Sequence, residues 1–314
     1  MCKIFVLTNT NKLTTKQLEN LIEKVSIPVT DNMSDGFGLA YSTENSFYAE
    51  RWVSPNDFLM RKATVGPNDD ALMLPPLMDA FGEKTKASGG LLMHGRQSTN
   101  NVSLENTHPF INDRYALIHN GVVHNEGDAV LRLTDNDTEF LLIKYSQGGM
   151  ERVSESLSGY YACGMLDAEN GNTIIFRDAT ARLYVAWFEK FETYVFATTK
   201  SIIIAAANSL GVKKFNVREA AENFHAVFDQ NGKLLESTGF TPKLRSFGAL
   251  DKQSLGVEFD WTHYEQDVPV YRQDESIMQI VNERGMPISE IAYDMLNNAE
   301  QMKCSFIRNG QLVA

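Results

Sequence analysis

The sequence of 314 residues is poor in cysteine. It contains three, Cys2, Cys163 and Cys304, and no CxxC pair. Three cysteines this far apart in the sequence exclude a disulfide framework and do not form a cysteine-based zinc site. It also favours a reducing compartment, so we expect a cytoplasmic protein.

Long apolar runs and an excess of positive charge are also missing. No apolar run approaches the roughly 18–20 residues that cross a bilayer, and no signal-peptide pattern opens the chain. The formal net charge is −11, from 40 acidic and 29 basic side chains. Because anionic surfaces repel such a chain, we expect no membrane partner, and binding to nucleic acid is disfavoured.

The sequence does contain many short apolar runs. Several are apolar on both faces, as in strands covered on both sides, and they follow one another instead of alternating strictly with helices. This order predicts a layered α+β fold. The predicted strands are 4–7, 36–42, 46–50, 89–95, 115–119, 160–166, 172–176, 182–188 and 193–199. The predicted helices are 18–25 behind an N-cap at Thr14, and then 138–148, 150–157 and 200–209.

Composition changes near residue 236, where a Gly-, Pro- and Ser-containing linker begins. Apolar stripes at 277–281 and 288–302 then predict two helices. Residues 251–314 carry eleven acidic and five basic side chains, which does not suit DNA reading. We therefore predict a main domain over 2–235 and a linker plus small, mostly helical C-terminal extension over 236–314. We expect its apolar face to pack on the chain's own body, with contact in a homo-oligomer as a secondary role.

Cys2 stands beside Met1 and directly before a predicted buried strand. Removal of Met1, which we expect, leaves a free α-amino group on the same residue as a thiol. An amine next to a nucleophile is a known way to activate it. Most cysteines are small apolar fillers, however, so Cys2 alone decides nothing.

Four polar segments accompany Cys2. They are HGRQSTN (94–100), NTHPF (106–110), LIHNGVVHN (117–125) and NDTEF (136–140). In this order, the set resembles the class II glutamine amidotransferase domain, an N-terminal-nucleophile hydrolase family. The resemblance covers about residues 2–235 and implies a four-layer αββα sandwich and an enzyme that uses no cofactor and no metal.

The resemblance also implies how an amide is hydrolysed. Cys2 attacks the side-chain amide of glutamine and forms a thioester, while its α-amino group carries the proton. The side-chain amide of Asn120 and the backbone N–H of Gly121 form the oxyanion hole.

The same resemblance assigns the substrate-binding residues. Arg96 binds the α-carboxylate of glutamine, a group that its planar guanidinium suits. Thr99 belongs to the same segment and is expected to bind substrate with it. Asp137 takes the α-ammonium group, so that both charges of the amino acid have a partner.

Each motif also has an ordinary structural interpretation. Asn120-Gly121 is a hairpin-turn signal. Asp137 suits the first turn of a helix, where Asn136 and Glu139 have capping-box spacing. His94, His108 and His119, which lack metal-ligand spacing, are interpreted as structural.

The sequence also departs from the family pattern. Lys3 stands where Gly usually follows the nucleophile, Gln97 replaces an aromatic residue and Asn100 replaces a histidine. These changes surround the expected glutamine-binding loop and bear on strict glutamine preference.

Three functions therefore stay open. Residues 236–314 are too few for a fused synthase domain, so the first hypothesis is a glutaminase that supplies ammonia to a separate synthetase or ligase. The second is a stand-alone hydrolase of γ-glutamyl amides or peptides. The third is a non-catalytic binding scaffold, which the intact set of site residues disfavours.

Overall fold

The structure is a computed structural model. It describes residues 2–44, 46–56, 58, 87–98, 101–127 and 130–243, and then 279–281, 287–288, 305–308 and 311–313. The chain divides into two compact units, Met1–Val270 and Tyr271–Ala314, which are described separately.

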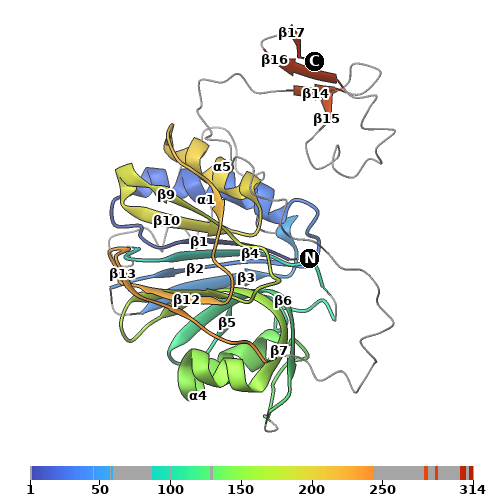
Figure 1. Ribbon diagram of the computed structural model, residues 1–314, viewed down its shortest axis with the longest axis vertical. Helices are drawn as coiled ribbons and strands as arrows, with labels where there is room; N and C mark the ends of the chain where they lie inside the picture. The colour runs from blue at the N-terminus through green and yellow to red at the C-terminus, as the bar shows by residue number, and fades with distance from the viewer. Residues whose placement is uncertain are drawn as a thin grey trace. The chain divides into compact units, whose positions relative to one another are not determined.

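Two antiparallel sheets form the centre of the first unit (Figure 1). The upper sheet has the order β11-β9-β10-β1-β4-β2-β3 and the lower sheet the order β13-β12-β8-β7-β6-β5. The upper strands are β1 (Lys3–Leu7), β2 (Phe37–Ser42), β3 (Phe47–Trp52), β4 (Leu91–Gly95), β9 (Tyr184–Phe188), β10 (Thr193–Ala197) and β11 (Arg218–Glu219). The lower strands are β5 (Phe110–Ile111), β6 (Tyr115–Asn125), β7 (Leu157–Asp167), β8 (Asn172–Arg177), β12 (Phe224–Phe228) and β13 (Leu234–Gly239).

The two sheets bury a shared apolar core between them. Ile4 and Val6 of β1 belong to the same buried cluster as Ile118 of β6 and Ala162 of β7. Strands covered on both faces explain why the sequence shows apolar runs instead of a clean alternation of apolar and polar residues.

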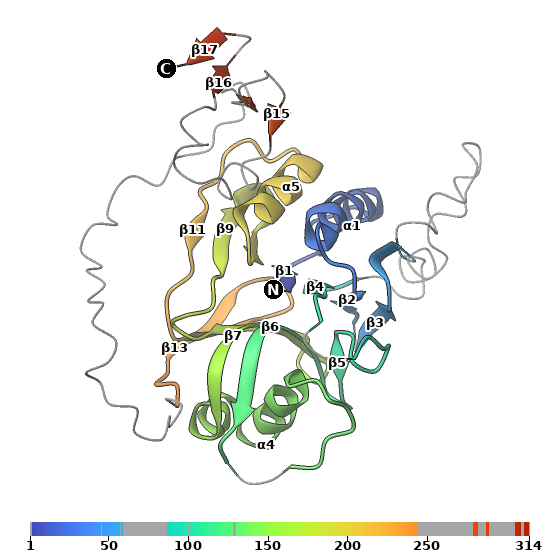
Figure 2. The same cartoon turned by 90° about the vertical axis from the view of Figure 1, so that its right-hand side faces the viewer.

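Helices cover the outer face of each sheet (Figures 1 and 2). On the upper sheet lie α1 (Thr15–Thr30) and α5 (Lys200–Leu210), and on the lower sheet lies α4 (Thr138–Ser156). As predicted, Thr14 is the N-cap of α1, and it forms a capping box with Gln17. Gly148 and Gly149 have non-helical dihedral angles, and so kink α4 between the two predicted helical segments. The predicted αββα sandwich is confirmed.

The second unit contains a small antiparallel sheet in the order β15-β14-β16-β17. Its strands are β14 (Gln279–Val281), β15 (Pro287–Ile288), β16 (Ser305–Arg308) and β17 (Gln311–Val313). The prediction of a mostly helical extension is wrong for these residues, because a short apolar stripe suits either structure and strand pairing decides between them. The rest of the predicted helix over 288–302 lies outside the described residues. The division of the chain at residues 235 and 236 and the packing of the extension stay predictions.

None of the described helices is long and apolar enough to span a bilayer.

Candidate functional site

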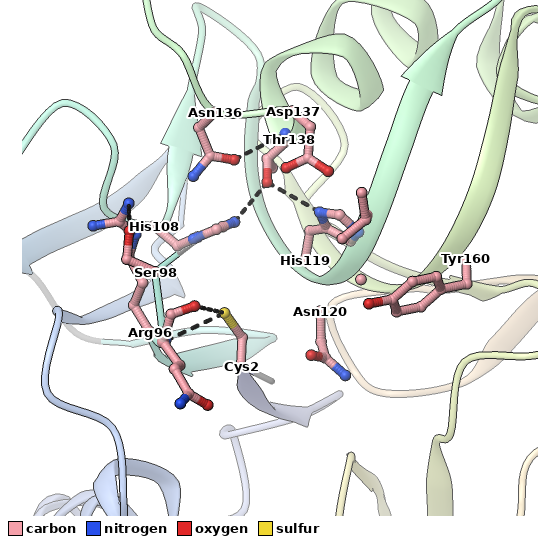
Figure 3. A pocket seen from close by; sticks show the side chains of 13 residues that line it. Cys2, Arg96, Ser98, His108, His119, Asn120, Asn136, Asp137, Thr138 and Tyr160 are labelled. Carbon is pink, nitrogen blue, oxygen red and sulfur yellow. Dashed lines mark hydrogen bonds between the residues drawn. The ribbon is translucent and has the colours of Figure 1, made fainter. Parts of the chain in front are cut away.

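A cavity of about 290 Å³ opens between the sheets and the start of α4. Its lining includes five of the predicted site residues, drawn in Figure 3: Cys2, Arg96, Asn120, Gly121 and Asp137. The sixth, Thr99, lies outside the described residues.

Strand pairing brings these distant residues together. Lys3 of β1 lies opposite Gly95 of β4, so the residues just outside this pair, Cys2 and Arg96, come to the same end of the upper sheet. Asn120 and Gly121 lie in β6 of the lower sheet, and Asp137 directly precedes α4. The cavity therefore collects side chains from both sheets and from a helix end.

The thiol of Cys2 contacts the backbone of Gln97. Cys2 Sγ lies 3.4 Å from the Gln97 nitrogen and 3.5 Å from its carbonyl oxygen. Burial raises the pKa of the Cys2 thiol, and the Gln97 N–H, the amino terminus and Arg96 only partly oppose this. The resting group is therefore a thiol, and nucleophilic attack needs a base beside it.

Arg96 is anchored by protein groups as well as lining the cavity. Its side chain is buried, and it donates to the carbonyl oxygen of Asp35 (3.2 Å), to Ser98 Oγ (2.9 Å) and to the Asn101 carbonyl oxygen (3.0 Å). Because burial disfavours the charged form, the pKa of Arg96 is lowered, while Cys2 and Asp35 act in the opposite direction.

Asp35 organises the same loop and was not among the predicted site residues. Its Oδ2 accepts the Ser98 N–H at 2.7 Å, and its Oδ1 accepts the Ser34 hydroxyl at 2.6 Å. These two hydrogen bonds lower the pKa of Asp35. Asp35 directly precedes the Gly-Phe-Gly segment at 36–38, but nothing in the local sequence indicates its contact with Ser98.

Asn120 and Gly121 lie inside a continuous strand, so their interpretation as a hairpin turn is wrong. They face Ala162 and Tyr161 of β7. Gly121 has φ +153°, and a Cβ there would lie 2.0 Å from the Tyr160 carbonyl oxygen and 2.7 Å from His119 Nε2. Only glycine fits this position. Asn120 Nδ2 makes no hydrogen bond with the described residues, so it is available to a ligand.

Asp137 points a carboxylate oxygen into the site without capping its helix. Its side chain makes no capping bond, and its Oδ2 accepts the Val123 N–H at 2.7 Å. The capping-box interpretation is also wrong, because Glu139 accepts the N–H groups of Leu133 and Thr134 (2.7 and 2.8 Å). This hydrogen bond connects Asp137 to β6 at Val123, two residues after Gly121.

Two buried histidines that line the cavity, His108 and His119, meet at Thr138, and a third, His94, packs against them. Thr138 Oγ1 lies 2.8 Å from His108 Nε2 and 3.0 Å from His119 Nδ1 (Figure 3). His94 Nε2 donates to the His119 carbonyl oxygen at 3.0 Å, and its ring stacks on His108 with 3.8 Å between centroids. Burial is the main cause that lowers the pKa of all three, that of His94 to about 3. Neutral and hydrogen-bonded, they form a structural network, and the described residues contain no cluster that could hold a metal ion.

Lys3, one of the departures, anchors the strand that follows the nucleophile. Its Nζ donates to the carbonyl oxygens of Pro28 (3.0 Å) and Asp31 (2.7 Å) at the end of α1. A cation suits the partial negative charge of a helix C-terminus. Lysine therefore connects β1 to α1 at the cavity end of the sheet.

We expect Lys3→Met to lower the free energy of unfolding by about 0.5–1.5 kcal/mol, because it removes two charge-assisted hydrogen bonds. Urea unfolding measures this. Lys24→Met is the matched control: Lys24 is half exposed and, within the described part of the chain, its ion pair is with its neighbour Glu23, so the change should be near zero. Equal effects of the two substitutions would contradict the anchoring role.

Comparison with known proteins relates much of the site, though not Cys2, to a known family. Residues 94–205 match the model of a glutamine amidotransferase domain. Glutamine–fructose-6-phosphate aminotransferase (isomerizing) of Photorhabdus laumondii is 23% identical over 66% of this chain and 36% of its own length. The enzyme of the same name from Staphylococcus aureus is 35% identical over 26% of this chain and 17% of its own length.

A solved structure also resembles the chain. Glutamine phosphoribosylpyrophosphate amidotransferase from B. subtilis aligns over 77% of this chain and 50% of its own, with 19% identity and a TM-score of 0.49. The chain thus spans about a third or less of the length of these curated relatives and half of the solved one. Residues 94–205 thus resemble a glutamine amidotransferase domain, and the structure brings Cys2 against this segment at Gln97.

Proposed function

We propose that this protein hydrolyses the side-chain amide of glutamine through a thioester on Cys2, and that an acceptor on a separate synthetase or ligase uses the ammonia. The observation that carries the proposal is the cavity shared by Cys2, Asn120, Gly121 and Asp137. Hydrolysis of the side-chain amide of an amino acid requires a nucleophile, hydrogen-bond donors for the oxyanion and a group that binds the α-ammonium of the substrate.

The reaction begins with transfer of the Cys2 thiol proton to the α-amino group that removal of Met1 exposes. A base is required because burial raises the pKa of this thiol. Sulfur then bonds to the amide carbon, and the carbonyl π electrons move to oxygen. Asn120 Nδ2 and the Gly121 N–H stabilise that oxyanion, a contribution of about 100–1,000-fold in rate for one donor.

Collapse of the tetrahedral intermediate expels the nitrogen. The α-ammonium group of Cys2 returns its proton to that nitrogen, ammonia leaves and the thioester remains. Water attacks the thioester with the α-amino group as base, which releases glutamate and restores the thiol. At the other end of the substrate, Asp137 binds the α-ammonium group of glutamine, and Arg96 and Thr99 bind its α-carboxylate.

Hydrolysis of γ-glutamyl amides or peptides is the second candidate. Gln97 is exposed and lines the cavity where the family usually has an aromatic residue. A polar side chain there suits a peptide group as well as a primary amide. Both candidates use the same thioester, so only the leaving group separates them.

Cys2→Ala tests the proposal. We expect the wild type to release ammonia from glutamine and the variant to lose at least about 10⁴-fold in kcat, because Cys2 is the only thiol among the described residues that line the cavity. The measurement is ammonia release at saturating glutamine, with a γ-glutamyl dipeptide as parallel substrate. Intact mass of the active protein should show a chain that starts at Cys2.

Cys163→Ala is the matched control. Cys163 is buried in β7 and does not line the cavity, so this variant should keep its activity even where its stability falls. An active Cys2→Ala variant, or an active chain that retains Met1, would refute the mechanism. Faster turnover of the dipeptide than of glutamine would favour the second candidate.

A further inference from the structure

Tyr160 lies beside the proposed oxyanion donors although no motif pointed to it. In the antiparallel pair of β6 and β7, Asn120 lies opposite Ala162 and Tyr160 lies opposite Val122. Tyr160 is two residues before Ala162, so it shares the inner face of the sheet with Asn120 as its diagonal neighbour. Such diagonal neighbours lie roughly 7–8 Å apart, with a somewhat shorter Cβ–Cβ distance, which is within reach of an aromatic side chain.

The two tyrosines of β7 point to opposite faces. Tyr161 is buried in the core between the lower sheet and α4, whereas Tyr160 packs at the edge of the core between the sheets and lines the cavity. The main chain of Tyr160 also touches the site, because its carbonyl oxygen occupies the space that a Cβ of Gly121 would need.

The hydroxyl of Tyr160 has no hydrogen-bond partner among the described residues. Figure 3 shows it directed toward Asn120 at the edge of the cavity. Asn120 lines the same cavity, and its side-chain amide likewise makes no hydrogen bond with a described residue.

We propose that the Tyr160 hydroxyl is a third donor to the substrate's γ-carbonyl oxygen and strengthens its hydrogen bond as that oxygen becomes negative. This inference rests on the proposed function. No bond to Tyr160 forms or breaks: the electrons of the attacked carbonyl stay on its oxygen, and the thiol proton still passes through the α-amino group to the leaving nitrogen. Tyr160 would act mainly in the transition state, and thus on kcat more than on KM.

Tyr160→Phe removes the hydroxyl and keeps the ring. We expect kcat for glutamine to fall roughly 10–100-fold, with KM changed less than about threefold, as for the loss of a donor used in the transition state. A second measurement uses the γ-aldehyde analogue of glutamine, which forms an oxyanion-bearing adduct with a thiol. Its inhibition constant should rise in parallel with the loss in kcat, while that of the product glutamate should stay within about threefold.

Tyr161→Phe is the matched control. Its hydroxyl is buried without a hydrogen-bond partner in the described part of the chain, so its removal should leave kcat and the aldehyde affinity unchanged. The thermal unfolding midpoint of both variants reports on a purely structural role.

The outcomes separate this inference from the proposed function. Wild-type hydrolysis that depends on Cys2, together with the selective losses in Tyr160→Phe, supports both. Wild-type hydrolysis with an unchanged kcat in Tyr160→Phe overturns the role of Tyr160 alone. That role is also overturned if the variant loses aldehyde and glutamate affinity equally, or if it loses only thermal stability. A wild type without Cys2-dependent hydrolysis overturns both.

Discussion

Gly121→Ala is expected to abolish glutamine hydrolysis and to destabilise the fold by about 3 kcal/mol or more. The positive φ alone costs about 1–3 kcal/mol for a residue with a side chain. The new methyl group would also lie 2.0 Å from the Tyr160 carbonyl oxygen, so β6 must move away from β7. That movement displaces the Gly121 N–H and the neighbouring Asn120, which are the two proposed oxyanion donors.

Urea unfolding and ammonia release measure the two effects. Gly211→Ala is the matched control, since Gly211 also has a positive φ, +64°, but has open space where a Cβ would stand. We expect it to cost about 1 kcal/mol and to leave kcat unchanged. If the two substitutions behave alike, the close approach of β6 to β7 has no functional meaning.

The second large effect is a steep loss of stability in acid. His94, His108 and His119 are buried as neutral rings, with pKa values lowered mainly by burial. In the unfolded chain each binds a proton below pH about 6.5. The native state therefore binds fewer protons than the unfolded state, and its stability is full above that pH and falls as the pH is lowered toward the folded pKa values.

Each histidine contributes a slope that approaches about 1.4 kcal/mol per pH unit wherever it is protonated in the unfolded chain and neutral in the native state, so stability should fall steeply below pH about 6. Urea unfolding at several pH values measures this. His94→Gln retains an amide donor for the His119 carbonyl oxygen and removes one titrating ring, so the slope should become shallower. An unchanged slope in this variant would rule out His94 as a source of the acid sensitivity.

Much of the sandwich and most of the candidate site could be predicted from the sequence, because the signals are local. A thiol next to Met1, a glycine after Asn120 and an aspartate before a helix are each encoded within a few residues. The apolar runs likewise predict strands, since a strand buried on both faces has apolar side chains at consecutive positions. The order of the motifs then predicted an amidotransferase-type site.

Other features depended on residues far apart in the chain. The register of β1 against β4 places Cys2 beside Arg96, and the register of β6 against β7 places Tyr160 beside Asn120. Asp35 likewise gains its role from Ser98. No local pattern specifies such a register, because shifting a strand by two residues preserves its alternation of faces while changing every partner.

Local signals with two meanings were also decided only by the tertiary structure. An Asn-Gly pair suits a tight turn, yet Asn120-Gly121 continues a strand because β7 pairs with β6 along its whole length. The short apolar stretch at Gln279–Val281 suits one face of a helix, yet it pairs with β16. The sequence by itself thus determined the layers and the chemical groups of the site. Tertiary pairing decided their partners, because hydrogen bonds between strands join residues that the local sequence does not relate.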